Sequence, residues 1–220
     1  GLVEHLTRSF ETIAAPDHSG SRYGIRTSLL FAVGDGNHSL ATAKRVWENL
    51  KAAGVDPQGH PARHALVEVV NIHSVPFEPI HRVVFGVNRE LIAIALSELF
   101  AEPPRTAGSR EEALGIAHAA SKTERRVALL GRDQSQTVRL AGSGLVHAEV
   151  QRTLEENLPP QAEVDYVHGE REAARLVAEE GAAAVVLPPF DRSALFREVV
   201  HHGPLPRKVF SMGHAEDKRY

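Results

Sequence analysis

Cysteine is absent from the 220 residues of the chain. Its absence excludes disulfide bonds, thiolate nucleophiles, iron–sulfur clusters and cysteine zinc sites, and it is typical of a protein from the reducing cytoplasm. Long apolar runs are also absent, since no stretch approaches the roughly 18 residues of a membrane span. No basic segment followed by an apolar one opens the sequence. We therefore expect a cytoplasmic protein with no membrane partner.

An excess of charge of one sign is missing too. Lys and Arg number 25 against 28 Asp and Glu, which gives a formal net charge of -3. Proteins that bind nucleic-acid backbones usually carry a clear basic excess, so the charge balance disfavours nucleic acid as a partner. Hydrophobic residues make up 42% of the chain, as in ordinary globular proteins. A chain of this length can bury a sizeable core in one large domain or two small ones.

Helical and strand-like segments alternate along the chain, which predicts a mixed protein of the α+β class, or an α/β fold with antiparallel edges. We expect a first α/β segment over 1–103, closed by Pro103-Pro104, and a second α/β lobe over 104–220, or one continuous domain. The first segment is predicted to hold helices over 1–14, from the glycine turn to Gly54 and over 90–100, a loop over 15–26, and strands over 27–33, 64–72 and 81–87. The second is predicted to hold helices over 110–122, 146–157, 170–180 and 192–201, and strands over 126–131, 137–141, 163–167, 182–187 and 208–212.

The segment Leu29–Leu40 combines an apolar strand, two glycines and four polar residues just before an amphipathic helix. We call its residues 35–39, Asp-Gly-Asn-His-Ser, the polar box. A strand, a glycine-rich turn and a helix N-terminus direct unpaired amides and the positive end of a helix dipole at one point, which suits a phosphate. We predict phosphate-binding roles for Gly36, Asn37 and Ser39. For Asp35 and His38 we predict catalytic roles in proton transfer, or beside a metal ion.

A turn followed by a helix cap is the alternative interpretation of the polar box, since Gly, Asp, Asn and Ser favour such positions for local reasons. A turn and a cap need only one glycine and one polar residue. This segment has two glycines, Gly34 and Gly36, and four polar side chains. Histidine is also a poor cap. These details favour a ligand site.

A second group of polar residues surrounds the end of the predicted strand over 64–72. Glu68 lies inside that apolar strand, and alternation of strand side chains puts Asn71 and His73 on one side of its end. Ligands of α/β proteins collect beyond strand ends. We predict substrate-side roles for five residues: Asn71, His73, Glu78, His81 and Arg82. A polar loop after a strand is the alternative.

The histidines offer no clear metal site. His60 and His64 have the i, i+4 spacing of a helical pair, but Pro61 argues against a long helix there. His201 and His202 near a helix end suit the helix dipole. With 13 histidines in the chain, chance pairs are expected, so we predict no metal ligand.

The residues from Phe31 to Lys44 resemble the signature of a bacterial and archaeal domain of unknown function, number one thousand and fifteen, which more widely carries Asp-Gly-His-His-Arg at the polar box. Further segments are similar to the same family: His60–Arg63, Glu68–His73, Phe77–Arg82, Asp165–Gly169 and Phe210–Tyr220. The resemblance spans nearly the whole chain. It implies that the sequence is the C-terminal half of a longer protein whose N-terminal half supplies part of the site.

More distantly, the polar box resembles that of the ParB/sulfiredoxin-like fold, in which a strand–turn–helix segment binds nucleotide phosphates. Free serine kinases of that group use an aspartate and a histidine here, which Asp35 and His38 match, while Ser39 stands where their arginine usually is. The resemblance implies a nucleotide or phosphorylated metabolite as ligand and a small-molecule phosphotransferase reaction with ATP or ADP and Mg²⁺. The alternatives are a non-catalytic nucleotide-sensing or protein-interaction module, and DNA binding in the manner of ParB, which the charge balance disfavours.

Overall fold

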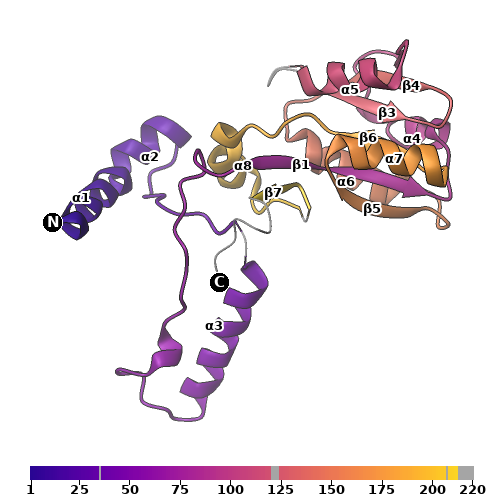
Figure 1. Ribbon diagram of the computed structural model, residues 1–220. Coiled ribbons are helices and arrows are strands. Elements are labelled where there is room, and N and C mark those ends of the chain that lie inside the picture. The colour runs from indigo at the N-terminus through magenta and orange to yellow at the C-terminus, as the bar shows by residue number, and fades with distance from the viewer. Residues whose placement is uncertain (35, 120–123, 207, 213–220) are drawn as a thin grey trace. The chain divides into compact units, whose positions relative to one another are not determined.

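The computed structural model describes residues 1–34, 36–119, 124–206 and 208–212. The chain divides into two compact units, Gly1–Ser74 (unit 1) and Val75–Tyr220 (unit 2). The division falls between Ser74 and Val75, whereas the first segment was expected to end at residue 103. The strand predicted over 81–87 and the helix predicted over 90–100 therefore belong to unit 2. Figure 1 labels the helices and strands of both units.

Unit 1 is built from helices. They are α1 (Leu2–Ala14), α2 (Pro16–Tyr23), α3 (Asn37–Ala52) and the short 3-10 helix η1 (Pro61–Arg63). The helices predicted over 1–14 and up to Gly54 are confirmed, and Gly54 has the left-handed φ of 83° that suits the end of a helix. The loop predicted over 15–26 is wrong, because α2 occupies most of it. Pro16 starts this helix in the first turn, where proline is favoured, and Gly24 ends it.

The two strands predicted in unit 1 are wrong. Residues 27–33 and 64–72 are described, and neither belongs to a strand. Phe31 is 54% exposed and Leu66 fully exposed, although both were expected on buried strands. An apolar run forms a strand only when another strand completes its hydrogen-bond ladder, and the described part of unit 1 offers none. The first run is held instead by Ser19, whose Oγ accepts the Leu29 N–H at 2.9 Å.

Unit 2 contains a β-sheet and helices that pack on it, and the strand pairs of its described residues are all antiparallel. The strands are β1 (Phe77–Phe85), β2 (Arg105–Thr106), β3 (Arg126–Leu130), β4 (Ser135–Arg139), β5 (Glu163–His168), β6 (Ala183–Val186) and β7 (Phe210–Met212). Their order is β2-β4-β3-β6-β1-β5, and β7 pairs with one end of β1. The α+β class is therefore confirmed, and the hairpin predicted around residues 133–135 is present as β3 and β4.

Helices cover both faces of this sheet (Figure 1). They are α4 (Arg89–Ala95), α5 (Arg110–Ala119), α6 (Val146–Asn157) and α7 (Glu170–Glu180). Unit 2 also contains η2 (Ser97–Leu99), η3 (Arg192–Ala194) and α8 (Leu195–His202). Apolar residues of α4 and α6 pack on one face with Val84, and those of α5 and α7 pack on the other with Val83. Successive side chains of β1 point to opposite faces of the sheet, and helices cover both faces. This strand is therefore buried on both sides.

Most predicted elements of unit 2 are confirmed. The helices predicted over 146–157 and 170–180 match α6 and α7. The helix predicted over 90–100 is shorter, because α4 ends at Ala95 and a 3-10 turn follows. The strand predicted over 81–87 begins earlier, at Phe77, because its first residues pair with β7. The last three residues of the helix predicted over 110–122 lie outside the described residues.

Candidate functional site

The polar box lies at the start of α3. Gly36 precedes the helix with a left-handed φ of 76°, and its carbonyl accepts the Leu40 N–H at 2.9 Å. A Cβ at this position would meet no atom within 4 Å, so the site needs glycine for its backbone conformation and not for space. Asp35, the predicted catalytic carboxylate, lies outside the described residues. The turn therefore directs the chain into the helix with the first amides of α3 at the box.

An open pocket of about 550 Å³ lies beside the first two turns of α3. His38 and Ser39 of the polar box form part of its wall, and both side chains are exposed, as is Asn37. The remaining wall residues are Thr42, Ala43, Val46, Ala62 and His64. The structure thus places two predicted site residues at one pocket.

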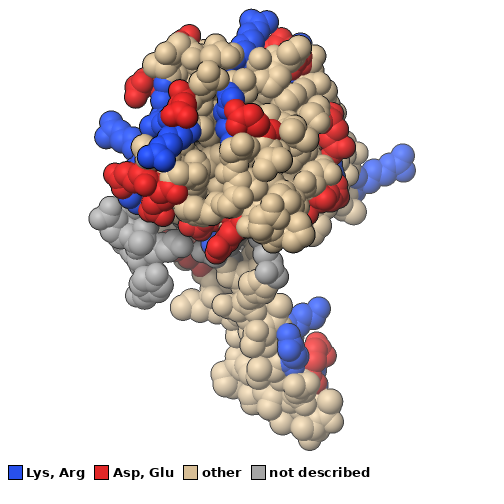
Figure 2. Space-filling model, turned by 90° about the vertical axis from the view of Figure 1, so that its right-hand side faces the viewer, with Lys and Arg blue, Asp and Glu red and all other residues tan. Residues whose placement is uncertain are grey.

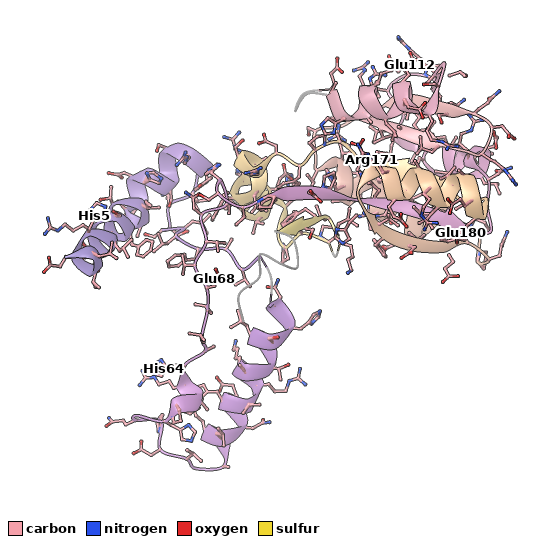
Figure 3. The ribbon with its side chains drawn as sticks, in the orientation of Figure 1. His5, His64, Glu68, Glu112, Arg171 and Glu180 are labelled. Atoms are coloured by element: carbon pink, nitrogen blue, oxygen red, sulfur yellow. The ribbon has the colours of Figure 1, made fainter. Side chains whose placement is uncertain are left out.

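The segment around η1 forms the opposite wall of this pocket. The ring of Trp47 on α3 lies 5.8 Å from that of His60, and His60 Nδ1 accepts the Ala62 N–H at 3.1 Å. His60 thus orders the turn that carries His64 into the pocket wall. Figure 3 shows His64 on this segment and Glu68 on the extended chain after it. Among the described residues, no group of three or more His, Asp or Glu is arranged to hold a metal ion.

The predicted substrate-side residues divide between the two units. In unit 1, Asn71 forms a tight turn in which its Oδ1 accepts the His73 N–H at 3.0 Å. In unit 2, Glu78 lies on β1 opposite Ser211 of β7. His81 and Arg82 follow on β1 and are almost completely buried. The substrate-side roles of these residues remain predictions.

A buried polar cluster surrounds Arg82 in unit 2. Arg82 Nε donates to Gln151 Oε1 at 2.5 Å, and its guanidinium lies 5.0 Å from the ring centre of Tyr166. Gln151 Nε2 donates in turn to Tyr166 Oη at 2.9 Å and to Glu155 Oε1 at 2.6 Å. One side chain of α6 therefore links the arginine of β1 to the tyrosine of β5.

Two histidines complete this buried polar cluster. His81 Nδ1 accepts the Leu187 N–H at 3.2 Å, and His147 packs edge-on against Phe190 with ring centres 5.8 Å apart. Burial, and after it the charge of Arg82, lowers the pKa of His81 to about 4 and that of His147 to about 3. Both rings are neutral at pH 7.

Sequence reasoning missed Gln151, Tyr166 and His147, although a signal was present. His147, Gln151 and Glu155 are spaced four residues apart on α6, so they share one face of the helix. That face meets Arg82, a charged residue directly before the apolar run Val83–Phe85 of β1.

On the face of unit 2 drawn in Figure 2, Lys and Arg side chains lie next to Asp and Glu at the margins, and neither sign forms a large patch of its own on this face. No helix in the described parts of the chain is long and apolar enough to cross a bilayer.

Comparisons with known proteins give a family and a fold. The family model described as "Protein of unknown function (DUF1015)" matches residues 3–166. A free serine kinase variant solved with ADP is 16% identical with a TM-score of 0.51, over 94% of this chain and 80% of the kinase chain. The same kinase solved with AMP is 16% identical with a TM-score of 0.50, over 95% and 79% of the two chains. No curated protein matches the sequence.

Proposed function

Since the chain belongs to the family described as proteins of unknown function (DUF1015), we propose a function from its own geometry. The protein binds a nucleotide or a phosphorylated small metabolite at the start of α3. One observation supports this most directly: the pocket beside α3 is walled by His38 and Ser39 of the polar box. Helix α3 has 16 residues, long enough for its dipole to favour an anion at its N-terminus.

Each residue of the polar box has a role in this proposal. The backbone of Gly36 and the side chains of Asn37 and Ser39 hold the phosphate through hydrogen bonds. His38 lies at the pocket wall, where an imidazole stabilises charge on a transferring phosphoryl group. Asp35 orients Mg²⁺ or accepts the proton of a substrate hydroxyl. In unit 1, Asn71 and His73 are the substrate-side residues of this proposal. The substrate-side roles predicted for Glu78, His81 and Arg82 stay predictions, since these residues belong to unit 2 and His81 and Arg82 are buried there.

The shared fold supports a nucleotide as the ligand. Free serine kinase was crystallised with ADP and with AMP, and it aligns with nearly the whole of this chain. We extend nucleotide binding, and with it a cytoplasmic phosphotransferase reaction using ATP or ADP with Mg²⁺, to this chain as a proposal. The likeness to the ParB/sulfiredoxin-like fold stays a prediction.

A non-catalytic nucleotide sensor or interaction module is the second candidate. The residue that favours it is Ser39, since a serine cannot replace the two-pronged phosphate contact of the arginine expected there. Both candidates require nucleotide binding. Only the phosphotransferase forms a phosphorylated product from ATP or ADP and a hydroxyl-bearing metabolite, which mass spectrometry detects.

Calorimetric titration with AMP, ADP and ATP, with and without Mg²⁺, tests the proposal. We expect His38→Ala to weaken binding of the best nucleotide about tenfold, as for loss of one charge-assisted hydrogen bond. His5→Ala on α1 is the matched control, since His5 is an exposed helical histidine of the same unit that lies outside the pocket wall (Figure 3). Absence of binding by all three nucleotides, or equal loss in both variants, would refute the site.

A further inference from the structure

Arg82 is a buried cation without a carboxylate partner among the described residues. Its side chain is fully buried in the middle of β1. Nε donates to Gln151, one terminal nitrogen donates to the Ile80 carbonyl, and Nη2 has no hydrogen-bond partner in the described parts of the chain. Both acceptors are neutral. A buried charge without a counter-charge is strongly unfavourable, so this guanidinium is suited to receive an anion.

The groups packed around Arg82 do not supply that negative charge. His81 and His147 are neutral at pH 7, and neither ring nitrogen of His147 has a well-formed hydrogen bond in the described structure. Glu155 is the carboxylate whose charge acts on Arg82, but it is exposed and is linked to Arg82 by hydrogen bonds only through the Gln151 side chain. The buried members of the cluster, Arg82, Gln151, His81 and His147, therefore carry one positive charge, that of Arg82.

A pocket of about 420 Å³ opens beside this cluster. Its wall is formed by Ala148, Gln151, Arg152, Glu155, Tyr166 and Pro206. Gln151 and Tyr166 also contact the guanidinium of Arg82, so a single layer of side chains separates the pocket from the buried charge. The pocket lies wholly within unit 2 and shares no residue with the pocket beside α3.

We propose that this pocket binds a small organic acid, with the carboxylate group of the ligand paired to Arg82. The Gln151 amide oxygen, 2.5 Å from Arg82 Nε, occupies the position that a carboxylate oxygen takes in an arginine–carboxylate pair. On binding, the carboxylate replaces this oxygen. The Gln151 amide turns away from Arg82 as one rigid group, which breaks its hydrogen bonds to Glu155 and Tyr166 and frees these two side chains for the ligand.

The charges of the pocket select a carboxylate over a phosphate. On the pocket wall Arg152 and Glu155 carry one charge of each sign, so the net positive charge is that of Arg82. A carboxylate balances this single charge, whereas a phosphate dianion exceeds it. Glu155 is an acceptor for a hydroxyl or ammonium group on the same ligand, whereas the aromatic face of Tyr166 contacts its carbon atoms. The site is independent of nucleotide binding at α3.

Thermal unfolding in sodium acetate tests the proposal, with sodium chloride at equal ionic strength as reference. We expect a saturable rise of a few degrees in the melting temperature of the wild-type protein, since a ligand of the folded state stabilises it. Arg82→Met abolishes the rise. Arg126→Met is the matched control and retains it, because Arg126 is a similarly shielded arginine that pairs with Glu102 at 3.0 Å.

Three outcomes would overturn the proposal: no saturable rise in the wild type, an equal rise in Arg82→Met, or a rise with inorganic phosphate in place of acetate. Should Arg82→Met fail to fold, NMR of the arginine Nε–H groups in the wild-type protein decides. The Arg82 signal, assigned by its loss in Arg82→Lys, shifts with acetate and not with chloride if the carboxylate replaces Gln151. A signal that acetate leaves unmoved contradicts the site.

Discussion

His81 and His147 place two imidazole rings inside unit 2, one on β1 and one on α6. In the folded protein they bind protons only near pH 4 and pH 3, whereas an unperturbed histidine does so at 6.5. Between these values the unfolded chain binds protons that the folded chain does not. Acid therefore favours unfolding through these two rings.

We expect the free energy of unfolding to fall as the pH drops below about 6.5, with a limiting slope of about 1.4 kcal/mol per pH unit for each histidine. Denaturant titrations at pH 7 and pH 5 measure it. Because carboxylates add their own acid dependence, the test is a comparison of variants. His147→Phe should reduce the difference in stability between the two pH values.

His202→Gln is the control for this comparison. His202 is an exposed histidine on α8 whose Nδ1 lies 3.0 Å from Glu198 Oε2. This variant should keep the full difference between pH 7 and pH 5. A His147→Phe protein with an unchanged difference would contradict the role of the buried ring.

At the residue scale, the sequence identifies unusual polar residues, but it does not reliably predict where in the fold they lie. Arg82 stands out as a charged residue before the apolar run Val83–Phe85, but its burial depends on β5 and β6, which lie about a hundred residues further along the chain. His38 and Ser39 are found at a pocket because the strong helix signal after Gly36 places them. Pairing with distant strands determines the position of Arg82, whereas local helix geometry determines the positions of His38 and Ser39.

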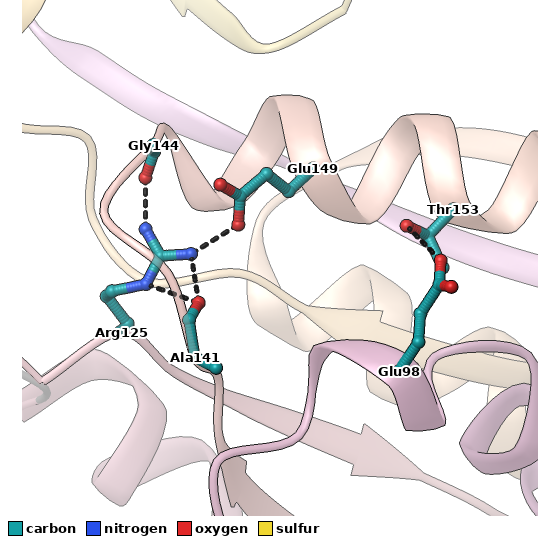
Figure 4. A network of polar contacts seen from close by, with 6 residues as sticks. All are labelled: Glu98, Arg125, Ala141, Gly144, Glu149 and Thr153. Carbon is teal, nitrogen blue, oxygen red and sulfur yellow. Dashed lines mark hydrogen bonds and ion pairs between the residues drawn. The ribbon is translucent and has the colours of Figure 1, made fainter.

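At the scale of elements, Arg125 joins the start of β3 to the loop before α6 (Figure 4). Its guanidinium donates to the Ala141 carbonyl from Nε at 3.1 Å and from Nη2 at 2.7 Å, to the Gly144 carbonyl, and to Glu149 on α6. Thr153, one turn further along α6, donates to Glu98 at 3.4 Å. One face of α6 is thus held by polar contacts to two separate segments.

We expect Arg125→Ala to lower the free energy of unfolding by about 2–3 kcal/mol, because it leaves two carbonyls and a largely buried carboxylate without their donor. Denaturant titration measures the loss. Arg175→Ala provides the contrast, since Arg175 pairs with Glu172 and Glu179 on the exposed face of α7. Its removal should barely change the unfolding midpoint. Equal losses in the two variants would show that the burial of the Arg125 contacts adds nothing.

Elements with their own strong signals are predictable from the sequence, and elements that need partners are not. Helix α7 combines helical periodicity with Gly181 as a stop, and its bounds are predicted correctly. The apolar runs over 27–33 and 64–72 have the composition of strands but no strand to pair with in the described part of unit 1. Helix α2 was missed because Ser and Gly in its sequence indicate a loop.

For the whole molecule, the two units differ in how much apolar surface they bury. Helices α1 and α3 contain no buried residue, whereas the strands of unit 2 supply two large core clusters. Local opening costs little where few apolar contacts are lost. Unit 1 is therefore the less protected part of the protein.

Hydrogen exchange followed by mass spectrometry measures this difference. We expect amides of α1 and α3 to exchange at least about a hundredfold faster than those of β1, β3 and β6, because core strands open only with the whole unit. Peptides from α6 and α7 serve as internal controls for well-packed helices. Equal protection in the two units would contradict the expected order of stability. Added nucleotide should slow exchange at α3 if the proposed site is correct.

The position of β1 between β6 and β5 has a consequence during synthesis. This strand, at residues 77–85, pairs with β5, β6 and β7, all of which lie beyond residue 162. On the ribosome β1 stays unpaired while most of unit 2 is translated. Because its partners are far away in the sequence, we expect unit 2 to fold slowly. Nascent chains stopped before β6 should therefore be the ones that chaperones hold longest.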